Sequence, residues 1–412
     1  MEATSSFWLS NLPDRYFYTT HNLPSQTSVV IIGGGIAGVS TAYWLSRSGV
    51  DITLLEQRGI CGGATGRNGG HLNPRMTSDF GAALKQYGPE TALKILNFAH
   101  QNTEALKKFV AEHDVSCDLS FPGLVWLALS PDELTRVLES ASALTQYGLA
   151  GEYWDTEKCA ELMHSESFLG GIFYADAGQL WPAKLVIQMA TVAVSQGANL
   201  QTQTKAFQVD RQKNYFTVKT NRGQIKADHV VYATNAWASE LLPCLEDLIV
   251  PARGQVLVTT PTSPLWNFGF STNFGYEYCQ QRRDGRIVLG GMRWLSQTSE
   301  IGIIDDTAIN PIVSSGLRGF LFQHFPTLQT LKVEQEWTGI LGFSKDNNPL
   351  IGALPHRIGE YIIAGFSGHG MAMAFLAGRT VAEMIMGRVA QPWVDVFDPS
   401  RFFSSETALF EP

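Results

Sequence analysis

Residues 29–56, VVIIGGGIAGVSTAYWLSRSGVDITLLE, constrain the fold of this chain more than any other stretch. The β-branched run 29–32 is typical of a buried parallel strand, and it breaks abruptly into the spacing G-x-G-x-x-G at Gly33, Gly35 and Gly38. In such a turn the first glycine permits a tight reversal, the second lets the backbone approach a pyrophosphate, and the third lets the next helix pack closely. The stretch therefore predicts a phosphate-binding unit.

The residues after the glycines complete this unit. Residues 36–48 suit a helix whose first amides and dipole would face the phosphates, and residues 50–55 suit a second strand. Glu56 ends that strand, where a carboxylate can accept hydrogen bonds from an adenosine ribose and would repel a 2′-phosphate. An ordinary glycine-rich turn is the weaker explanation, because strand, helix and acidic residue occur together. At this point FAD and NAD both stay open.

A second glycine-rich run, GICGGATGRNGG at 59–70, directly follows the second strand. A flexible linker would contain more serine and would not begin beside a ribose-binding strand. We therefore predict a second backbone cradle for a large cofactor.

Composition excludes several other classes of protein. The chain has 412 residues, 44% of them hydrophobic and 17% charged, which is typical of a globular protein with room for two domains. Its net charge of −8 disfavours nucleic acid as a partner. The five cysteines are scattered and form no C-x-x-C pair, so we expect neither a disulfide framework nor a metal site. No membrane span or secretory leader is evident, and we expect a cytoplasmic protein.

Several further motifs support a resemblance to a known family. They are the fingerprint ending at Glu56, GATGRNGGH, AGQLWP, ATNAW, FPTL followed by EWTG, and GFSGHGMAMAFLAGRTVAEMI. Together they resemble the D-amino-acid oxidase-like flavoprotein superfamily, and most closely its γ-glutamylputrescine oxidase-like group. The motifs extend from residue 29 to about residue 390, and they specify the cofactor better than the substrate.

The resemblance implies an α/β fold. We expect a Rossmann-type FAD-binding domain of the glutathione-reductase kind in three parts, and a substrate domain in two parts built on an antiparallel sheet. The expected boundaries are a surface arm at 1–28, FAD-binding parts at 29–84, 165–245 and 335–390, substrate parts at 85–164 and 246–334, and a tail at 391–412. Helices are expected at 89–113, 131–147, 183–195 and 311–325, and a strand, glycine loop and helix from 360 onward.

FAD is the cofactor that the resemblance implies. The expected contacts are Gly33, Gly35, Ile36, Ala37, Gly38, Glu56, Gln57, Arg58, Gly63, Ala64, Thr65, Arg67, Asn68, Gly69, Gly70, His71, Phe207, Ala233, Thr234, Asn235, Trp237, Gly339, Gly368, His369, Gly370 and Met371. We expect non-covalent binding, because Arg67 stands where some relatives attach the flavin to histidine. In addition, no cysteine lies near residues 337–340, where others attach it.

The implied chemistry is oxidation of an amine or amino acid to an imine by hydride transfer to the flavin. Water would hydrolyse the imine, and O2 would reoxidise the flavin to give hydrogen peroxide. A dehydrogenase with another electron acceptor and a non-catalytic flavin-binding protein are the alternatives. An aromatic hydroxylase or halogenase would need a second nucleotide motif, and the sequence shows none.

Four residues are candidates for catalysis. The helix expected to begin near Met371 would stabilise negative charge on the flavin. His369 is a candidate proton shuttle or a packing residue. Tyr276 and Arg293 are pocket candidates by position, as are Trp181 and Tyr278, and either Arg253 or Arg293 could pair with a substrate carboxylate.

Two positions depart from the sarcosine oxidases of the superfamily. Those enzymes carry a lysine that promotes the reaction with oxygen where this chain has Val288. A second lysine, which holds the substrate carboxylate, corresponds to Ala372. A sarcosine-like amino acid held in that way is therefore not expected.

Overall fold

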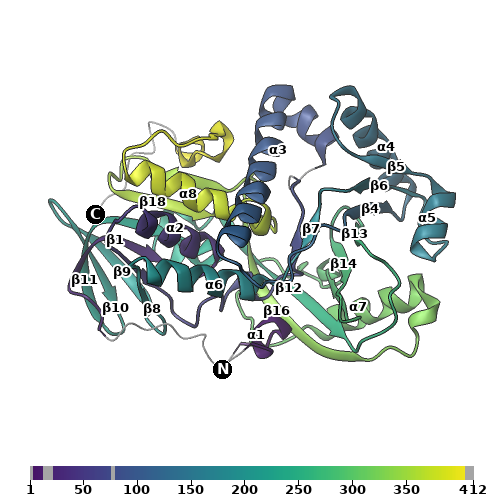
Figure 1. Cartoon of the computed structure of the whole chain (residues 1–412), viewed down its shortest axis with the longest axis horizontal. Coiled ribbons are helices and arrows are strands. Elements are labelled where there is room, and N and C mark those ends of the chain that lie inside the picture. Colours follow the sequence, from purple (N-terminus) through teal and green to yellow (C-terminus); the bar gives the residue numbers. More distant parts are fainter. Residues whose placement is uncertain (1–2, 13–21, 76–78, 404–412) are drawn as a thin grey trace.

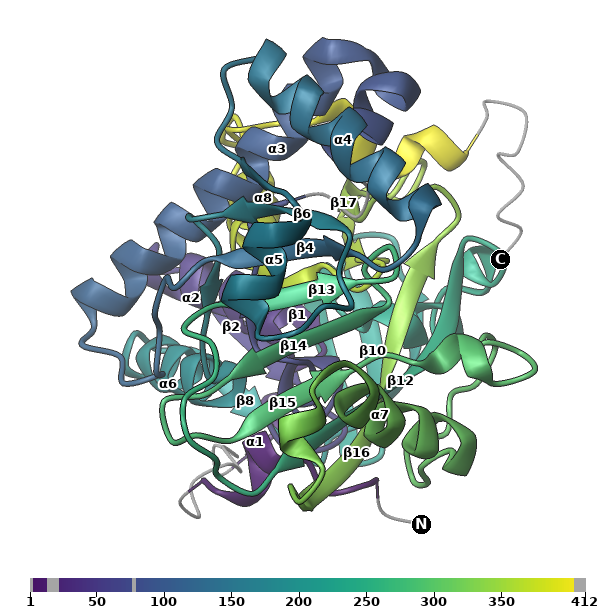
Figure 2. The same ribbon diagram turned by 90° about the vertical axis from the view of Figure 1, so that its right-hand side faces the viewer.

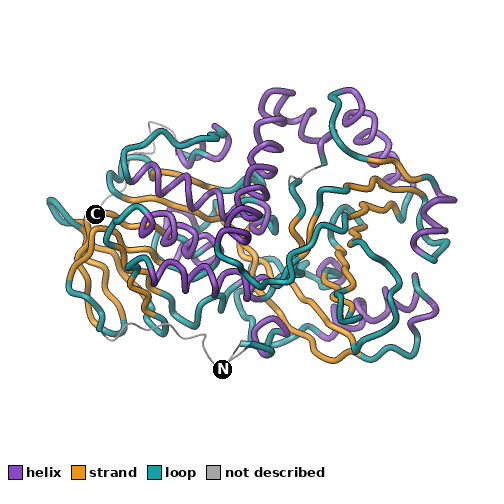
Figure 3. The backbone as a smooth tube through the Cα atoms, viewed as in Figure 1, coloured by secondary structure: helices purple, strands orange, loops and turns teal. Residues whose placement is uncertain are grey.

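The computed structural model describes residues 3–12, 22–75 and 79–403. Within these ranges the strands form two sheets of eight strands and one two-stranded ribbon. Figure 1 shows the two sheets in different halves of the molecule, the first on the left and the second on the right. Figure 3 shows that most helices lie above or beside these sheets. The expected α/β architecture with a second sheet is therefore confirmed.

The first sheet has a parallel centre that contains the glycine-rich unit. Its main path is β17 (Leu350–Ala353), β18 (Glu360–Ala364), β11 (Gly223–Tyr232), β1 (Gln26–Ile32), β2 (Ile52–Leu55) and β8 (Asn199–Gln201). From β18 to β8 neighbouring strands run parallel. The long strand β11 also pairs with β10 (Phe216–Thr220), which pairs with β9 (Ala206–Arg211), and both pairs are antiparallel.

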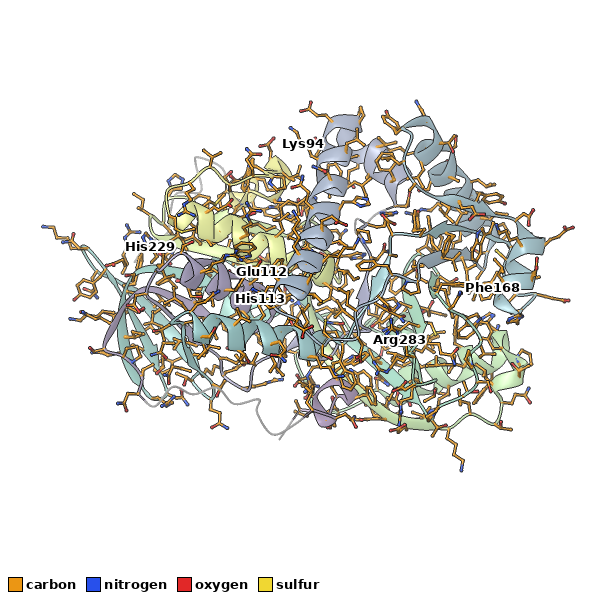
Figure 4. The ribbon with its side chains drawn as sticks, viewed as in Figure 1. Lys94, Glu112, His113, Phe168, His229 and Arg283 are labelled. Carbon is orange, nitrogen blue, oxygen red and sulfur yellow. The ribbon has the colours of Figure 1, made fainter. Side chains whose placement is uncertain are left out.

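Three helices pack against one another over this sheet: α2 (Ile36–Arg47), α6 (Pro182–Ser195) and α8 (Ala374–Ile385). Beneath them residues 29–32 of β1 and all of β2 are buried, as expected for the centre of a parallel sheet. A long helix, α3 (Phe80–Glu112), reaches α8 from the second half of the molecule and bends at Gly88, which precedes Pro89. At the end of α3, His113 meets Tyr43 of α2 at 3.2 Å (His113 is labelled in Figure 4).

The second sheet is largely antiparallel. Its order is β16 (Val333–Ser344), β12 (Ile249–Thr259), β15 (Ile287–Gly290), β14 (Glu277–Gln281), β13 (Gly269–Thr272), β4 (Leu124–Ala128), β6 (Gly170–Tyr174) and β5 (Glu152–Trp154). The pair β13 and β4 is parallel. Figure 2 shows α7 (Pro311–His324) and α5 (Thr156–Met163) in front of this sheet, and they share an apolar core with its strands. The other elements are α4 (Pro131–Gln146) and the ribbon of β3 (His71–Leu72) and β7 (Gly178–Gln179).

The division of the chain between the two sheets differs from the domain boundaries expected at residues 165 and 335. Strand β6 lies after residue 165 but pairs with β4 and β5 in the second sheet. Strand β16 continues past residue 335 and pairs with β12 along almost its whole length. Which sheet a strand joins depends on partners far away in the sequence, and local patterns do not specify them.

The expected surface arm at 1–28 is wrong for its described residues, while residues 1–2 and 13–21 lie outside the part that the structure describes. A short helix, α1 (Phe7–Ser10), buries Phe7 and Trp8 against Trp181 at the start of α6, and β1 already begins at Gln26. Part of the expected tail is also core, because Phe397 packs edge-on against Phe98 of α3. In both segments aromatic residues supply enough apolar area to keep the chain against the protein.

Candidate active site

The parallel strands β1, β2, β11 and β18 bring the loops that follow them to one edge of the first sheet. Ligands of open α/β sheets bind at this edge. A cavity of about 160 Å³ lies there. The predicted contacts that line it are Gly33, Gly35, Ile36, Ala37, Glu56, Gln57, Arg58, Gly63, Ala64, Thr65, Asn68, Ala233, Thr234, Asn235, Trp237, Gly368, Gly370 and Met371.

Two glycines of the first loop cannot be replaced without a clash. Gly33 has φ +117°, and a Cβ there would lie 2.5 Å from the carbonyl oxygen of Ala233. A Cβ on Gly38 would lie 1.9 Å from the carbonyl oxygen of Gly33. Gly38 therefore does not line the cavity but lets α2 approach the turn, as the sequence predicts.

The N-terminus of α2 points its amides toward this cavity. Its N-cap is Gly35, which has no side chain of its own to accept a first-turn amide. The N–H of Ile36 donates to Thr65 Oγ1 at 3.0 Å, which joins the two glycine-rich loops. The remaining first-turn amides and the helix dipole suit a phosphate.

Glu56 ties the same loops together. Its Oε2 accepts the N–H of Gly34 at 2.6 Å, and its Oε1 accepts the N–H of Arg58 at 2.7 Å. Burial raises the pKa of this carboxyl, and the two backbone donors oppose that rise. Each carboxylate oxygen can accept a further hydrogen bond, so the carboxylate keeps capacity for ribose hydroxyls.

Arg67 and Gly70 were expected to contact FAD, but neither of them lines the first cavity. The Arg67 guanidinium is 5% exposed, and it donates to the carbonyl oxygens of Gly62, Thr4 and Thr338. It lines the second cavity, described below, and its donors hold the backbone of the second glycine-rich loop. Gly70 lines neither cavity, and its φ of +77° allows the chain to turn beneath that loop.

The strand β9 carries one incorrect prediction. Phe207 lies outside the cavity lining and is 53% exposed, while its neighbour Ala206 lines the cavity. Successive side chains of a strand point to opposite sides, so the two residues of β9 cannot both face the cavity.

The loops after β11 and β18 are joined by a single side chain. Asn235, in the 3₁₀ helix η2 (Asn235–Glu240), accepts the N–H of Gly365 at 3.0 Å. Asn235 also lines the first cavity, so this hydrogen bond fixes two of its walls relative to each other.

The loop after β18 does not lead into a helix at Met371 as expected. A 3₁₀ turn, η6 (Gly370–Ala372), comes first, and α8 begins at Ala374. Asn102 of α3 fixes this junction: its amide donates to the Met371 carbonyl at 3.1 Å and its Oδ1 accepts the Leu376 N–H at 3.0 Å. The sequence analysis missed Asn102. The feature that marks it is that it is polar and fully buried on an otherwise apolar face of α3.

A second cavity, of about 470 Å³, lies between the two sheets. It shares Ala64, Asn68, Leu341, Gly368 and Met371 with the first cavity, so the two are adjacent. The predicted residues that line only the second cavity are Arg67, Gly69, His71, Tyr276, Tyr278, Arg293, Gly339 and His369.

Other pocket candidates lie elsewhere. Trp181 lines neither cavity, and its indole N–H donates to the carbonyl oxygen of Trp8 at 2.9 Å. Arg253 forms an ion pair with buried Glu300 at 2.5 Å, so its charge is already neutralised. Of the two arginines considered for a substrate carboxylate, only Arg293 lines the second cavity.

The histidines and the buried tyrosine of the second cavity are neutral at pH 7. Burial lowers the pKa of His71 to about 4, although its Nε2 donates to the Cys279 carbonyl at 3.2 Å. Burial also lowers the pKa of His369, whose Nδ1 lies 3.2 Å from the Ser367 carbonyl oxygen. The pKa of Tyr278 is raised to about 12 by burial. No Asp or Glu occurs in the described lining of this cavity.

Three structural features bear on the expectations about metals, membranes and cysteines. Across 3–12, 22–75 and 79–403 there is no group of His, Cys, Asp and Glu residues that could hold a metal ion. In the same part of the chain, no helix is both long and apolar enough to cross a membrane. All five cysteines are free thiols, and none belongs to the described lining of either cavity.

These features define a dinucleotide-binding protein with a second cavity placed against the first. A family described as DAO, FAD dependent oxidoreductase, matches residues 28–384, and the chain belongs to this family. It is therefore an FAD-dependent oxidoreductase, and its cofactor is FAD. The glycine N-cap of α2, the close approach at Gly38 and the acceptor Glu56 fit that cofactor.

Individual relatives are similar over most of the chain. Gamma-glutamylputrescine oxidoreductase of Escherichia coli (strain K12) is 26% identical over 396 residues, which cover 94% of this chain and 90% of that protein. Glycine oxidase of Bacillus licheniformis is 26% identical over 388 residues, covering 90% and 96%. The crystal structure of L-proline dehydrogenase from P. horikoshii aligns with a TM-score of 0.79 and 26% identity, covering 92% and 98%.

Proposed function

We propose that this chain oxidises the C–N bond of a small amine or amino acid. The carbon next to nitrogen loses a hydride and the nitrogen loses a proton, which leaves an imine. Water then hydrolyses the imine to an aldehyde or oxo acid and releases ammonia, or an amine where the substrate nitrogen carries a second carbon. When bound, FAD supplies the hydride acceptor, and molecular oxygen takes the two electrons to give hydrogen peroxide.

The contact between the two cavities carries this proposal. Their shared wall includes Asn68, Gly368 and Met371, so a cofactor in the first cavity would reach a substrate in the second. The second cavity has the size that is usual for small-molecule sites, and its lining combines apolar and aromatic walls with polar side chains. The similar proteins named for γ-glutamylputrescine, glycine and L-proline also favour an amine or amino acid as the substrate.

His369 is our candidate for receiving the amine proton. Its Nδ1 can donate to the Ser367 carbonyl, which leaves Nε2 with the lone pair of a neutral imidazole. The lowered pKa keeps the ring neutral, so it can accept a proton but holds it only weakly. Tyr276 and Arg293 would contact the substrate, and the backbone at Met371 would contact the cofactor.

The second candidate function differs in the molecule that accepts the electrons, and Val288 favours it. Val288 is fully buried in β15, and no lysine occurs in the described lining of the second cavity. A lysine in place of Val288 would stabilise the negative charge that develops on oxygen beside the reduced cofactor. A dehydrogenase that passes electrons to another acceptor is therefore the second candidate.

One experiment separates these possibilities. The purified protein is loaded with FAD and mixed anaerobically with a panel of amines and amino acids while the visible flavin band is recorded. Loss of the band with one class of compound supports the proposal, and no loss with any compound would favour a non-catalytic flavin protein. Admitting air and assaying peroxide then separates an oxidase from a dehydrogenase.

A cytoplasmic location goes with the proposal, because all five thiols are unpaired.

A further inference from the structure

Asn102 is a fully buried carboxamide within the long helix α3. Its Nδ2 donates to the Met371 carbonyl at 3.1 Å, and its Oδ1 accepts the N–H of Leu376 at 3.0 Å. These two backbone groups supply a partner for each end of a side chain whose burial would otherwise cost free energy. Because both partners are backbone groups, Asn102 fixes the path of the chain from η6 into α8.

The first turn of α8 is capped from another helix. Its N-cap is Met373, which makes no capping hydrogen bond with its side chain. Leu376 is the third residue of α8, and the amide at this position is one that an N-cap side chain usually bonds. Asn102 takes this role from α3, so the position of the first turn of α8 depends on α3.

The helix α3 is itself held on both sides of Asn102. Phe98 packs edge-on against Phe397 with ring centres 5.2 Å apart, and Phe109 packs edge-on against Tyr43 of α2 at 5.0 Å. The helix also contacts η6 and α8 (α3 and α8 are labelled in Figure 1). Since these contacts are all within the protein, Asn102 is in place before any ligand binds.

The junction that Asn102 holds lines both cavities. Gly370, Met371 and Ala374 line the first, and Met371 and Ala372 line the second. The N–H groups of Gly370 and Met371 donate to no other residue in the described part of the chain. These two donors and the start of α8 are therefore left for a ligand in the first cavity.

We infer that Asn102 is a positioning residue for FAD: through the backbone of Met371 and Leu376 it fixes the wall shared by the two cavities, and so raises both the affinity for FAD and the reduction potential of the bound flavin. This inference rests on the proposed function, which places the flavin end of FAD at that wall. Amide donors and a helix N-terminus favour the reduced flavin, because it carries more negative charge. Asn102 acts only through the backbone, since it is not among the described residues that line either cavity.

The test compares wild type with Asn102→Leu, Asn102→Asp and the control Thr103→Val. The first substitution nearly conserves volume and removes both hydrogen bonds. In the second, a carboxylate keeps an acceptor for the Leu376 N–H and loses the donor to the Met371 carbonyl. Thr103 is also buried in α3, but its hydroxyl donates to the Ala99 carbonyl of the same helix at 3.2 Å, so the control leaves the junction untouched.

Three quantities are measured for each protein: the affinity of the apoprotein for FAD, the potential of the bound flavin against reference dyes, and hydrogen exchange of residues 366–380 in the apoprotein. We expect Asn102→Leu to weaken FAD binding by roughly 5- to 50-fold, as for a buried donor and acceptor that lose their partners. Reduced FAD should lose about tenfold more affinity than oxidised FAD, which lowers the potential by about 30 mV. Exchange should become faster. Asn102→Asp should fall between Asn102→Leu and wild type, and Thr103→Val should match wild type.

Three results would overturn the inference: FAD affinity and potential unchanged in both Asn102 variants, an equal loss of affinity for oxidised and reduced FAD, as a purely structural role would give, or the same shift of potential in Thr103→Val. If Asn102→Leu retains no FAD, the potential of Asn102→Asp decides. Failure of the proposed oxidation looks different, because no amine then reduces the flavin of wild type while the potential still depends on Asn102.

Discussion

His71 shows how burial without a charged partner sets the protonation state of a residue beside the second cavity. Its pKa in the folded protein is about 4, against 6.5 for an ordinary histidine. Between these values the unfolded chain binds a proton that the folded chain does not. Stability is therefore lost as the pH falls from 6.5 to about 4.

Replacing this residue should reduce the acid sensitivity. In His71→Gln the amide can still donate to the Cys279 carbonyl, but nothing titrates at this position. We expect the melting temperature of the apoprotein to fall less than in wild type as the pH is lowered from 6.5 to about 4, the interval between the unfolded and folded pKa values of His71. An equal fall in both proteins would show that His71 is not the buried neutral group described here.

Gly38 is a second position where one residue controls the fold. Gly38→Ala would place a Cβ 1.9 Å from the Gly33 carbonyl oxygen, so α2 must move away from the turn. We expect the free energy of unfolding to fall by about 1–3 kcal/mol in urea titrations. The control is Gly319→Ala in α7, where a Cβ meets no atom within 4 Å and the helix should gain about 0.5–1 kcal/mol. Equal stability of the two variants would contradict this.

At the level of elements, the N-terminal segment holds the second glycine-rich loop in place. Ser6 Oγ donates to the Gly66 carbonyl at 2.5 Å, Trp8 Nε1 donates to the Asn68 carbonyl at 2.5 Å, and Thr4 accepts from Arg67. These contacts fasten residues 66–68, of which Asn68 lines both cavities and Arg67 lines the second. The segment therefore supports the cofactor site from outside it.

Trp8→Phe tests this support, because it keeps an aromatic ring and removes the N–H. We expect FAD to bind roughly 2- to 10-fold more weakly, as for one lost hydrogen bond. Trp44→Phe is the matched control, since the Trp44 indole N–H has no hydrogen-bond partner in the described part of the chain. Flavin fluorescence during titration of the apoproteins measures both. Equal FAD affinity in Trp8→Phe and wild type would refute the supporting role.

These elements also show what the sequence could and could not predict. The spacing of Gly33, Gly35 and Gly38, with the strand before and the acidic residue after, predicted the parallel unit because each of these features is local. The burial of α1 and the hydrogen bonds of Asn102 to the residues before α8 involve partners that are distant in sequence. No local sequence pattern could therefore predict them. Phe207 was predicted to contact FAD, but its neighbour Ala206 lines the cavity. Which side chains of a strand face a cavity depends on the register of that strand in the sheet.

In the whole molecule, the second cavity lies where the two sheets meet. The charge of the residues that line it determines which protonation state of the amine reacts. The described lining of this cavity has no carboxylate to hold an ammonium ion, so the amine must enter in its neutral form. We expect kcat/KM to rise about tenfold per pH unit until the pH reaches the pKa of the free amine. A rate profile that is flat below that pKa would mean that the protonated amine is bound and deprotonated by the protein.

The first cavity is assembled from loops that are distant in sequence, and one measurement tests that assembly. Apoprotein is titrated with FAD by calorimetry for wild type, Gly33→Ala and Gly368→Ala, since both glycines have positive φ values that alanine resists. One FAD per chain in wild type, and weaker binding in both variants, is the expected result. Undiminished FAD binding in either variant, or none in wild type, would contradict a single site built from the loops after β1 and β18.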